Sequence, residues 1–171
     1  MCIIFTPEQT MKQEYKPEKW IWTEADFAVM GWHDSRIHAI AFSPEDFELV
    51  FDIDYIFDWI DPQSNETYFK FWVAPATLVF KNVHEVELEI DSYNGNLEID
   101  NIKRGDERLP LNAEYIGKAS EWLWTIECTE GEIRFRSAAF EEFIRRAPQL
   151  TQSQTLDRKI RGISFARGRV D

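Results

Sequence analysis

The chain has 171 residues, of which 44% are hydrophobic, with 7 glycines and 7 prolines. This length is enough for one domain with a sizeable core, and the composition excludes disordered, collagen-like and low-complexity classes. The formal net charge of -12 is unevenly spread: residues 1–142 contain 12 basic and 29 acidic residues, a net of -17, and residues 143–171 contain 7 and 2, a net of +5. Such an acidic body repels nucleic acid and attracts basic partners, although it also favours solubility.

The chain starts with polar sequence that leads into a short helix. Residues 1–22 predict a partly loose N-terminal arm, because much of this segment is polar and it contains two prolines. Thr23 and Asp26 have the spacing of a capping box. A short helix should therefore follow as far as about Met30 and end at Gly31.

The next two segments predict a hairpin. Residues 36–42 and 47–60 flank SPED, a turn sequence with proline at its second position. Pairing Phe42 with Phe47 places His38 on the apolar face, where a lone histidine is usually a satisfied core residue. The opposite face then carries Asp52, Asp54 and Asp58. This register predicts that His38 and the acids point in opposite directions.

A second hairpin is predicted after a strand at 67–80. Residues 83–91 and 96–102 are joined by Asn94-Gly95, which is the strongest short signal for a tight turn, because a type I′ turn needs positive φ at both central positions. Ile90 and Ile99 then face each other on the core side. The reverse side carries five acids, which are Glu87, Glu89, Asp91, Glu98 and Asp100.

These five acids have three interpretations. Like charges opposite each other cost about 0.2–1 kcal/mol per pair, a small enough cost for a solvated outer face that blocks edge aggregation. They could instead form a docking patch for a basic protein. A calcium site is the third interpretation, but calcium needs oxygens that converge at about 2.3–2.6 Å, usually from a loop. Same-face carboxylates on a strand do not converge in this way.

The last third of the chain predicts one more hairpin and a helix. Residues 121–129 and 132–138 flank Glu130-Gly131, and Glu127 is expected opposite Arg134. Apolar residues with helical spacing then predict a short helix that begins near Ser137 and stops before Pro148. Residues 157–171 form a basic C-terminal tail, with GISFA as a candidate short strand.

These elements predict one mainly β (α+β) domain over residues 1–171. Its architecture is expected to be an antiparallel meander sheet of six to eight strands with two short helices, because the predicted hairpins are local. Cys2 and Cys128 form no CxxC motif and so favour neither a zinc site nor a disulfide framework. No signal peptide or membrane-spanning run is evident. We therefore expect a cytoplasmic location and no membrane.

Few residues suggest chemistry. His33 and Asp34 could perform acid–base work or bind a metal, which would make the protein a metal-assisted hydrolase. A structural interpretation is that Asp34 shapes a turn and His33 bonds to backbone. The sequence contains no glycine-rich phosphate loop, no GxSxG motif and no Cys–His nucleophile pair. Accordingly, we expect no catalytic residues, no bound metal and no cofactor.

Three segments follow one another in the first half of the chain: Trp32-His33-Asp34-Ser35-Arg36-Ile37, then LVFDIDYIFDW, then the stretch from Thr77 to Val83. Their order, over roughly residues 27–103, resembles a bacterial polymorphic-toxin immunity protein family, number fifty in that classification. EGEIRF at residues 130–135 is also similar to a piece of a related set of uncharacterised bacterial proteins. The immunity resemblance implies a cytoplasmic, non-catalytic protein that neutralises a toxin by direct binding.

The sequence therefore predicts a non-catalytic acidic binding protein whose partner is a basic protein. An acidic patch suits the implied immunity role, because many such toxins are nucleases with basic active sites, and complementary charge raises association rates. The five acids of the predicted hairpin are the candidate partner-binding residues. The segment that holds Trp32, His33, Asp34, Arg36 and His38 has no assigned role. A metal-assisted hydrolase and a housekeeping domain whose acidity only confers solubility remain the alternatives.

Overall fold

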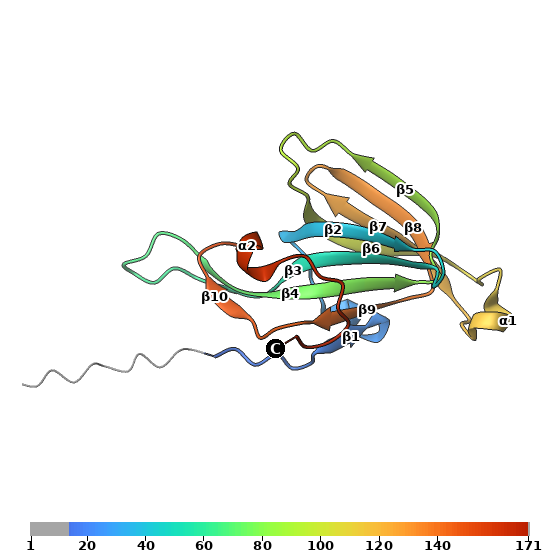
Figure 1. Ribbon diagram of the computed structural model, residues 1–171, viewed down its shortest axis with the longest axis horizontal. Coiled ribbons are helices and arrows are strands. Elements are labelled where there is room, and N and C mark those ends of the chain that lie inside the picture. Colours follow the sequence, from blue (N-terminus) through green and yellow to red (C-terminus); the bar gives the residue numbers. More distant parts are fainter. Residues whose placement is uncertain (1–13, 171) are drawn as a thin grey trace, which may run out of the picture.

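The computed structural model describes residues 14–170 and consists mainly of one large antiparallel sheet (Figure 1). The strands in this range are β1 (Ile21–Thr23), β2 (Ser35–Ser43), β3 (Glu48–Ile60), β4 (Lys70–Lys81), β5 (His84–Ile90), β6 (Glu98–Arg108), β7 (Glu121–Cys128), β8 (Gly131–Ser137), β9 (Ala139–Ile144) and β10 (Gln149–Thr151). The helices are the 3₁₀ helix η1 (Glu24–Val29) and the α-helices α1 (Ala113–Ile116) and α2 (Arg158–Arg161). The predicted mainly β, antiparallel class is confirmed, with ten strands and three short helices in the described range.

The sheet folds back on itself so that its two halves share one core. Its strand order is β1-β9-β4-β3-β2-β6-β7-β8-β5, with β10 beside β4. β2 and β6 pair only at Ser35 and Arg36, and the sheet turns there. The ring of Phe80 on β4 then lies 4.6 Å from that of Phe135 on β8 and 5.1 Å from that of Trp124 on β7. We call the face that turns toward the other half the inner face, and the opposite face the outer face.

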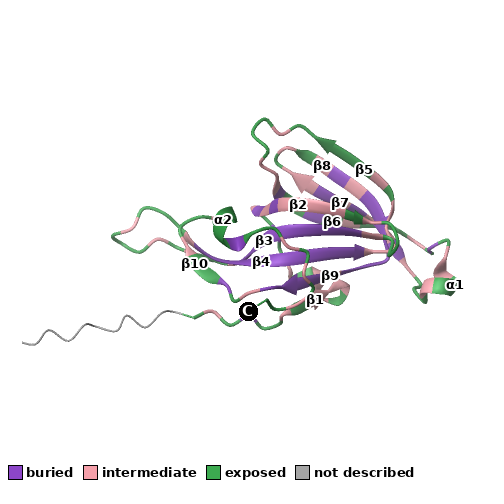
Figure 2. Cartoon of the chain, in the orientation of Figure 1, coloured by how far each residue is buried: buried purple, intermediate pink, exposed green. Residues whose placement is uncertain are grey.

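Burial is concentrated in the strands at the middle of the first half. In Figure 2, β4 and β9 are buried along almost their whole length and β3 is buried as far as Ile56, whereas β5 is largely exposed. The largest fully buried side chains are Trp124, Phe51, Phe80, Phe135, Phe140, Leu49, Ile53, Leu78, Ile99, Ile126, Ile133 and Ile144. All of them belong to one cluster on the inner faces of the two halves, which forms the main core.

The helix predicted near Ser137 is wrong, because residues 139–144 form β9 between β4 and β1. Both faces of this strand are covered. Phe140 and Ile144 belong to the inner core, whereas Phe143 packs with Val50 and Val79 on the outer face. A strand that is buried on both sides does not alternate between apolar and polar residues. Its apolar spacing therefore imitates that of a helix.

The β2–β3 hairpin is confirmed, but its register differs from the prediction. Phe42 lies opposite Leu49 rather than Phe47, which sits in the longer turn with a φ of 54°. A shift of two residues keeps the faces unchanged. The register shifts once more between Ile37 and Ala39. This bulge turns His38 to the outer face, so the prediction that His38 points away from the acids of β3 is wrong.

The predicted hairpin at residues 83–102 is also wrong. β5 pairs with β8, and β6 pairs with β7 and β2, so β7 and β8 lie between the two segments. Ile90 therefore lies opposite Gly131, and Ile99 opposite Cys128. The spatial order β5-β8-β7-β6 is that of a Greek key, because β6, β7 and β8 are consecutive neighbours and β5 lies beside β8. The connection after β5 therefore carries the chain past β8 and β7 to β6. Gly95 still adopts a positive φ of 76°, but within this connection.

The two ends of the described chain pack on the sheet. The ring of Tyr15 lies 5.4 Å from those of Phe57 and Trp72, tilted against both, and β1 pairs with β9. Within the predicted arm, Tyr15 and residues 21–22 thus contact the sheet. Residues 1–13 of the arm lie outside the described range. The basic tail crosses the outer face of β3 and β4 (Figure 1), and its first turn is α2. Residues 162–166, the candidate strand GISFA, do not form a strand.

The pairing of β5 with β8 can be tested at Gly131. Its φ is 140°, and an added Cβ would lie 1.9 Å from the backbone oxygen of Glu89. Gly131→Ala should therefore cost at least about 1–3 kcal/mol of unfolding free energy through backbone strain alone. Urea unfolding measures this cost, with Gly105→Ala as the control, because nothing lies within 4 Å of the added Cβ there. Equal stability of the two variants would contradict the observed pairing.

Candidate functional site

The five acids proposed for partner binding do not form a cross-strand cluster by themselves. Glu87 and Glu89 lie on β5, and Asp91 follows that strand. Glu98 and Asp100 lie on β6, which is separated from β5 by β7 and β8. The predicted oppositions of acid to acid within an 85–100 hairpin are therefore wrong. Their role in partner binding remains a prediction.

Acids from the intervening strands close the gap. Glu89 lies directly opposite Glu132 on β8, and Glu132 lies directly opposite Glu127 on β7. Glu127 was expected opposite Arg134, and this pairing is wrong. The turn between β7 and β8 adds Glu130, whose carboxylate accepts a hydrogen bond of 3.0 Å from the backbone N–H of Glu98. The resulting surface, which we call the acidic end, comprises Glu89, Asp91, Glu98, Asp100, Glu127, Glu130 and Glu132.

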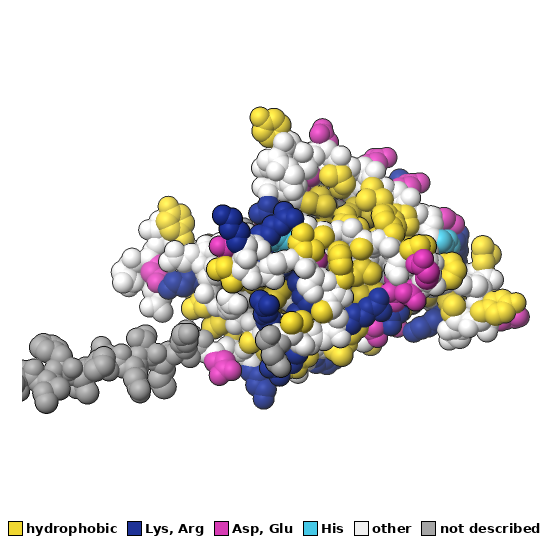
Figure 3. All heavy atoms as spheres, viewed as in Figure 1, with side chains coloured by type: hydrophobic (Ala, Val, Ile, Leu, Met, Phe, Trp, Pro, Cys, Tyr) yellow, Lys and Arg dark blue, Asp and Glu magenta, His cyan; other side chains and the backbone are white. Residues whose placement is uncertain are grey.

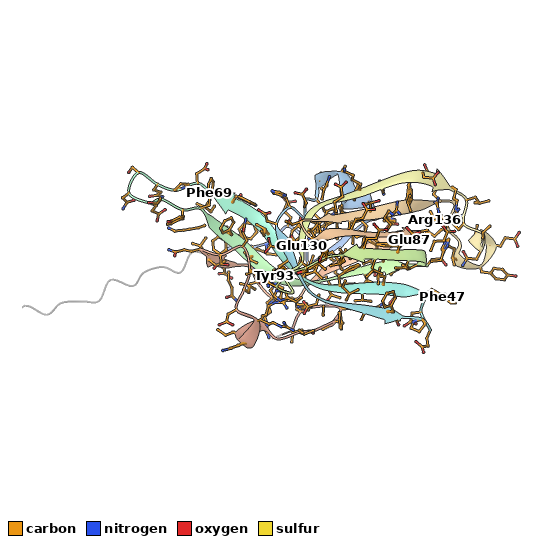
Figure 4. The ribbon with its side chains drawn as sticks, turned by 90° about the horizontal axis from the view of Figure 1, so that it is seen from above. Phe47, Phe69, Glu87, Tyr93, Glu130 and Arg136 are labelled. Carbon is orange, nitrogen blue, oxygen red and sulfur yellow. The ribbon has the colours of Figure 1, made fainter. Side chains whose placement is uncertain are left out.

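Nearby cations neutralise the acidic end only in part. Lys103 bonds to Glu127 at 2.6 Å, and Arg134 lies 3.3 Å from Glu132 and bonds to Glu87 at 2.6 Å. Among the described residues, four acids of this surface have no ion pair, namely Glu89, Asp91, Glu98 and Glu130. In Figure 4, Glu130 lies beside Tyr93 near the middle of the long axis, and Glu87 lies further from Phe69, on the side of Arg136 and Phe47. A partner with positive charge would therefore find unpaired carboxylates here.

Burial, together with two of these charges, makes the free thiol nearby unreactive. Burial first, and then the charges of Glu130 and Asp100, raise the pKa of Cys128 to about 12. The thiolate is the nucleophilic form of cysteine. At neutral pH Cys128 therefore remains a protonated, half-buried packing residue.

A second group of charges lies buried beneath the basic tail. Asp52 on β3 is fully buried, and it contacts Arg145 and Arg161 at 2.6 Å each. The backbone N–H of Ser164 donates to the same carboxylate at 3.0 Å. Burial would raise the pKa of Asp52, but the hydrogen bonds from Arg161 and Arg145 outweigh it and hold the pKa below its ordinary value. Asp52 is therefore ionised in the folded protein.

Asp54, two residues further along β3, extends this group to His38. Its Oδ2 accepts hydrogen bonds from the hydroxyl of Thr155 at 2.7 Å and from the backbone N–H of Leu156 at 2.9 Å, and lies 2.8 Å from His38 Nε2. Its Oδ1 lies 2.9 Å from Arg161 Nε, in ion-pair contact but without hydrogen-bond alignment. Every charge in this group has a buried partner, so the group fastens the tail to the sheet.

A buried acid in the inner core escaped the sequence analysis. Glu142 on β9 is fully buried, and it accepts a hydrogen bond of 2.7 Å from the indole N–H of Trp32. Burial raises the pKa of Glu142 to about 8, so the carboxyl is mainly protonated at neutral pH. Burial and the nearby Glu142 also raise the pKa of Tyr55. Expecting a helix at this position hid the signal, because Glu142 would then have faced solvent.

The segment from Trp32 to His38 does not form one site. Trp32 is a core residue, whereas His33 is exposed, stacks on Trp59 at 6.0 Å and lies 3.2 Å from the Asp100 carboxylate. Asp34 has a φ of 62°, as the turn interpretation predicts. Arg36 and His38 line a separate cavity of about 170 Å³.

No group of three or more His, Cys, Asp and Glu side chains within residues 14–170 is arranged to hold a metal ion. No helix in this range is both long and apolar enough to cross a bilayer. No family of known proteins, no curated protein and no solved structure matches this chain.

The buried charges predict a large effect at Asp52. Asp52→Asn should lower the free energy of unfolding by about 3–5 kcal/mol, because it leaves Arg145 and Arg161 buried without their counter-ion. Urea unfolding measures the loss. Asp58→Asn, on the exposed end of the same strand, serves as the control and should change stability by less than about 0.5 kcal/mol. Equal effects would mean that the tail is not held by this ion pair.

The raised pKa of Glu142 should make the free energy of unfolding depend on pH. Its folded pKa of about 8 lies above the ordinary value of 4.5, so its contribution is fully present below about pH 4.5 and is lost as the pH rises toward 8. The slope approaches about 1.4 kcal/mol per pH unit. Glu142→Gln should remove this slope and be more stable than the wild type at pH 7.5.

Urea unfolding at pH 5 and pH 7.5 tests the prediction for Glu142. The control is Glu141→Gln, at a residue that is half-buried and bonds to Lys81 at 2.6 Å. That variant should keep the wild-type slope. A slope that survives in Glu142→Gln would show that another group causes it.

Proposed function

We propose that this protein is a non-catalytic binding protein that docks a basic protein partner on its acidic end. The row formed by Glu89, Glu132 and Glu127 carries the proposal, because it places three carboxylates directly opposite one another on neighbouring strands. Such a row costs stability, about 0.2–1 kcal/mol for each opposed pair. Neutral residues would support the same ladder without that cost. A positively charged partner would relieve the repulsion on binding.

The sequence resemblance gives this binding a biological role. The segments around Trp32, Asp52 and Thr77 resemble those of an immunity protein family, and we assign the protein the corresponding function of neutralising a toxin in the cytoplasm. Toxins that act on nucleic acid have basic active sites, for which an acidic surface is a suitable cover. Long-range attraction would also accelerate capture of the toxin.

Neutralising the unpaired acids tests the docking surface. Glu89→Gln combined with Asp91→Asn removes two charges that have no ion pair among the described residues. The double variant should associate with the partner at least severalfold more slowly at low salt, with a smaller difference at high salt. It should also be slightly more stable alone. The measurement is stopped-flow binding to the product of the adjacent gene, where the toxin of an immunity protein is expected, together with urea unfolding.

The matched control removes two charges elsewhere. Glu45 is exposed in the turn between β2 and β3, and Glu114 is exposed on α1. Both α1 and that turn lie at the opposite end of the strands from the β7–β8 turn (Figure 1). Glu45→Gln combined with Glu114→Gln should bind as the wild type does. Equal slowing in both double variants would mean that association depends on the net charge of the protein and not on the position of the acids. The immunity role would be contradicted if the adjacent gene encoded no toxin, or if the wild type neither bound that toxin nor rescued cells that express it.

A further inference from the structure

The free edge of β5 has a definite backbone polarity. β5 ends the strand order, and no other strand of the described chain pairs with its second side (Figure 1). The backbone N–H of Asp91 donates to the carbonyl of Glu130 on the β8 side at 2.8 Å. Because backbone groups alternate in direction along a strand, Glu89 and Glu87 also face β8. Leu88 and Ile90 therefore direct their N–H and C=O groups toward the unpaired side.

The side chains of β5 divide cleanly between the two faces. Leu88 lies opposite the buried Ile133 and belongs to the inner face, as does Ile90, yet these two side chains are 44% and 38% exposed. Glu87 and Glu89 lie on the outer face. In Figure 3, hydrophobic side chains gather over β7 and β8, and acidic side chains lie along the outer rim. The edge thus presents an apolar row and an acidic row on either side of unpaired backbone groups.

This pattern selects against a second copy of the same chain. Residues that lie opposite each other in a sheet share a face, so an antiparallel pair of two β5 strands would bring glutamates against glutamates. A strand with basic residues opposite Glu87 and Glu89 would be attracted and not repelled. Its cations would face Glu87 and Glu89, and its apolar side chains would cover Leu88 and Ile90.

We propose that the free edge of β5 binds an extended segment of the basic partner as an additional antiparallel strand, in which basic residues alternate with apolar residues. This proposal rests on the proposed docking function and specifies how the partner is recognised. Backbone hydrogen bonds to Leu88 and Ile90 would supply affinity, and the two rows of side chains would supply specificity. The antiparallel direction continues the sheet and is the more stable pairing.

A seven-residue peptide of alternating lysine and valine with blocked ends is a suitable probe. In an antiparallel pair, residues opposite each other either exchange both backbone hydrogen bonds or exchange none. Valines opposite Leu88 and Ile90 would therefore direct their N–H groups toward β5, whereas the lysines would direct theirs toward solvent. Methylating the valine amides should weaken binding at least tenfold, and methylating the lysine amides should weaken it less than threefold. Isothermal titration measures both.

Each outcome of the peptide titration decides between mechanisms. Equal binding by the two methylated peptides, or by a peptide of the same composition with its lysines in one block, would show attraction by charge alone and overturn strand addition. No saturable binding of the parent peptide would overturn it as well. The docking function would survive either result if Glu89→Gln with Asp91→Asn still slows toxin association. Conversely, strand addition would stand without the toxin role if the peptides bind as expected but the substitutions at Glu89 and Asp91 leave toxin association unchanged.

Discussion

The packing of the C-terminal segment on the outer face of the sheet depends on one interaction, which is the ion pair of Asp52 with two arginines. Asp52 lies at the centre of β3, a strand that is buried on both faces and so leaves no room for a solvated carboxylate. Arg145 comes from the end of β9 and Arg161 from α2. The acid thereby requires the C-terminal segment to cross the sheet at one place. That segment in turn covers the apolar residues of the outer face, including Val73 and Ile56 beside Leu156.

This arrangement explains the uneven charge of the chain in a way that composition cannot. The buried arginine of the basic tail, Arg161, pairs with Asp52 and Asp54 of β3 and not with the acidic end. The acidic end therefore keeps most of its charge in the folded protein, with Lys103 and Arg134 as partial counter-ions. The tail stabilises the fold, and the acids of β5 to β8 remain available to a partner.

Local sequence predicted much of the fold and failed where distant strands decide the outcome. The hairpins β2–β3 and β7–β8 follow from turn residues and alternation, which are local. Asn94-Gly95 is an equally strong turn signal in the sequence, yet β5 pairs with β8 and not with the strand that follows this turn. A Greek key depends on pairing between distant strands, which no local pattern indicates. One bulge at His38 reversed the direction of a side chain. β9 lost its alternation because both of its faces are covered.

The candidate site shows the same division. Glu87 and Glu89 were identified correctly as outer-face acids of a strand, whereas Glu127, Glu130 and Glu132 became part of the acidic end only through the pairing of β7 and β8 with their neighbours. Glu142 was missed because a helix was expected at its position. In each case the sequence shows the acidic residue itself, whereas its neighbours in space depend on which strands pair.

The span of the Asp52 ion pairs has a consequence for how the protein is made. Arg145 and Arg161 follow Asp52 by 93 and 109 residues along the chain. During synthesis, β3 must therefore leave the ribosome long before either arginine exists. In that interval its acid stays solvated and its outer apolar surface stays uncovered, as contacts of high sequence separation form late. Translation speed and chaperones would thus affect the yield of this protein through a single carboxylate.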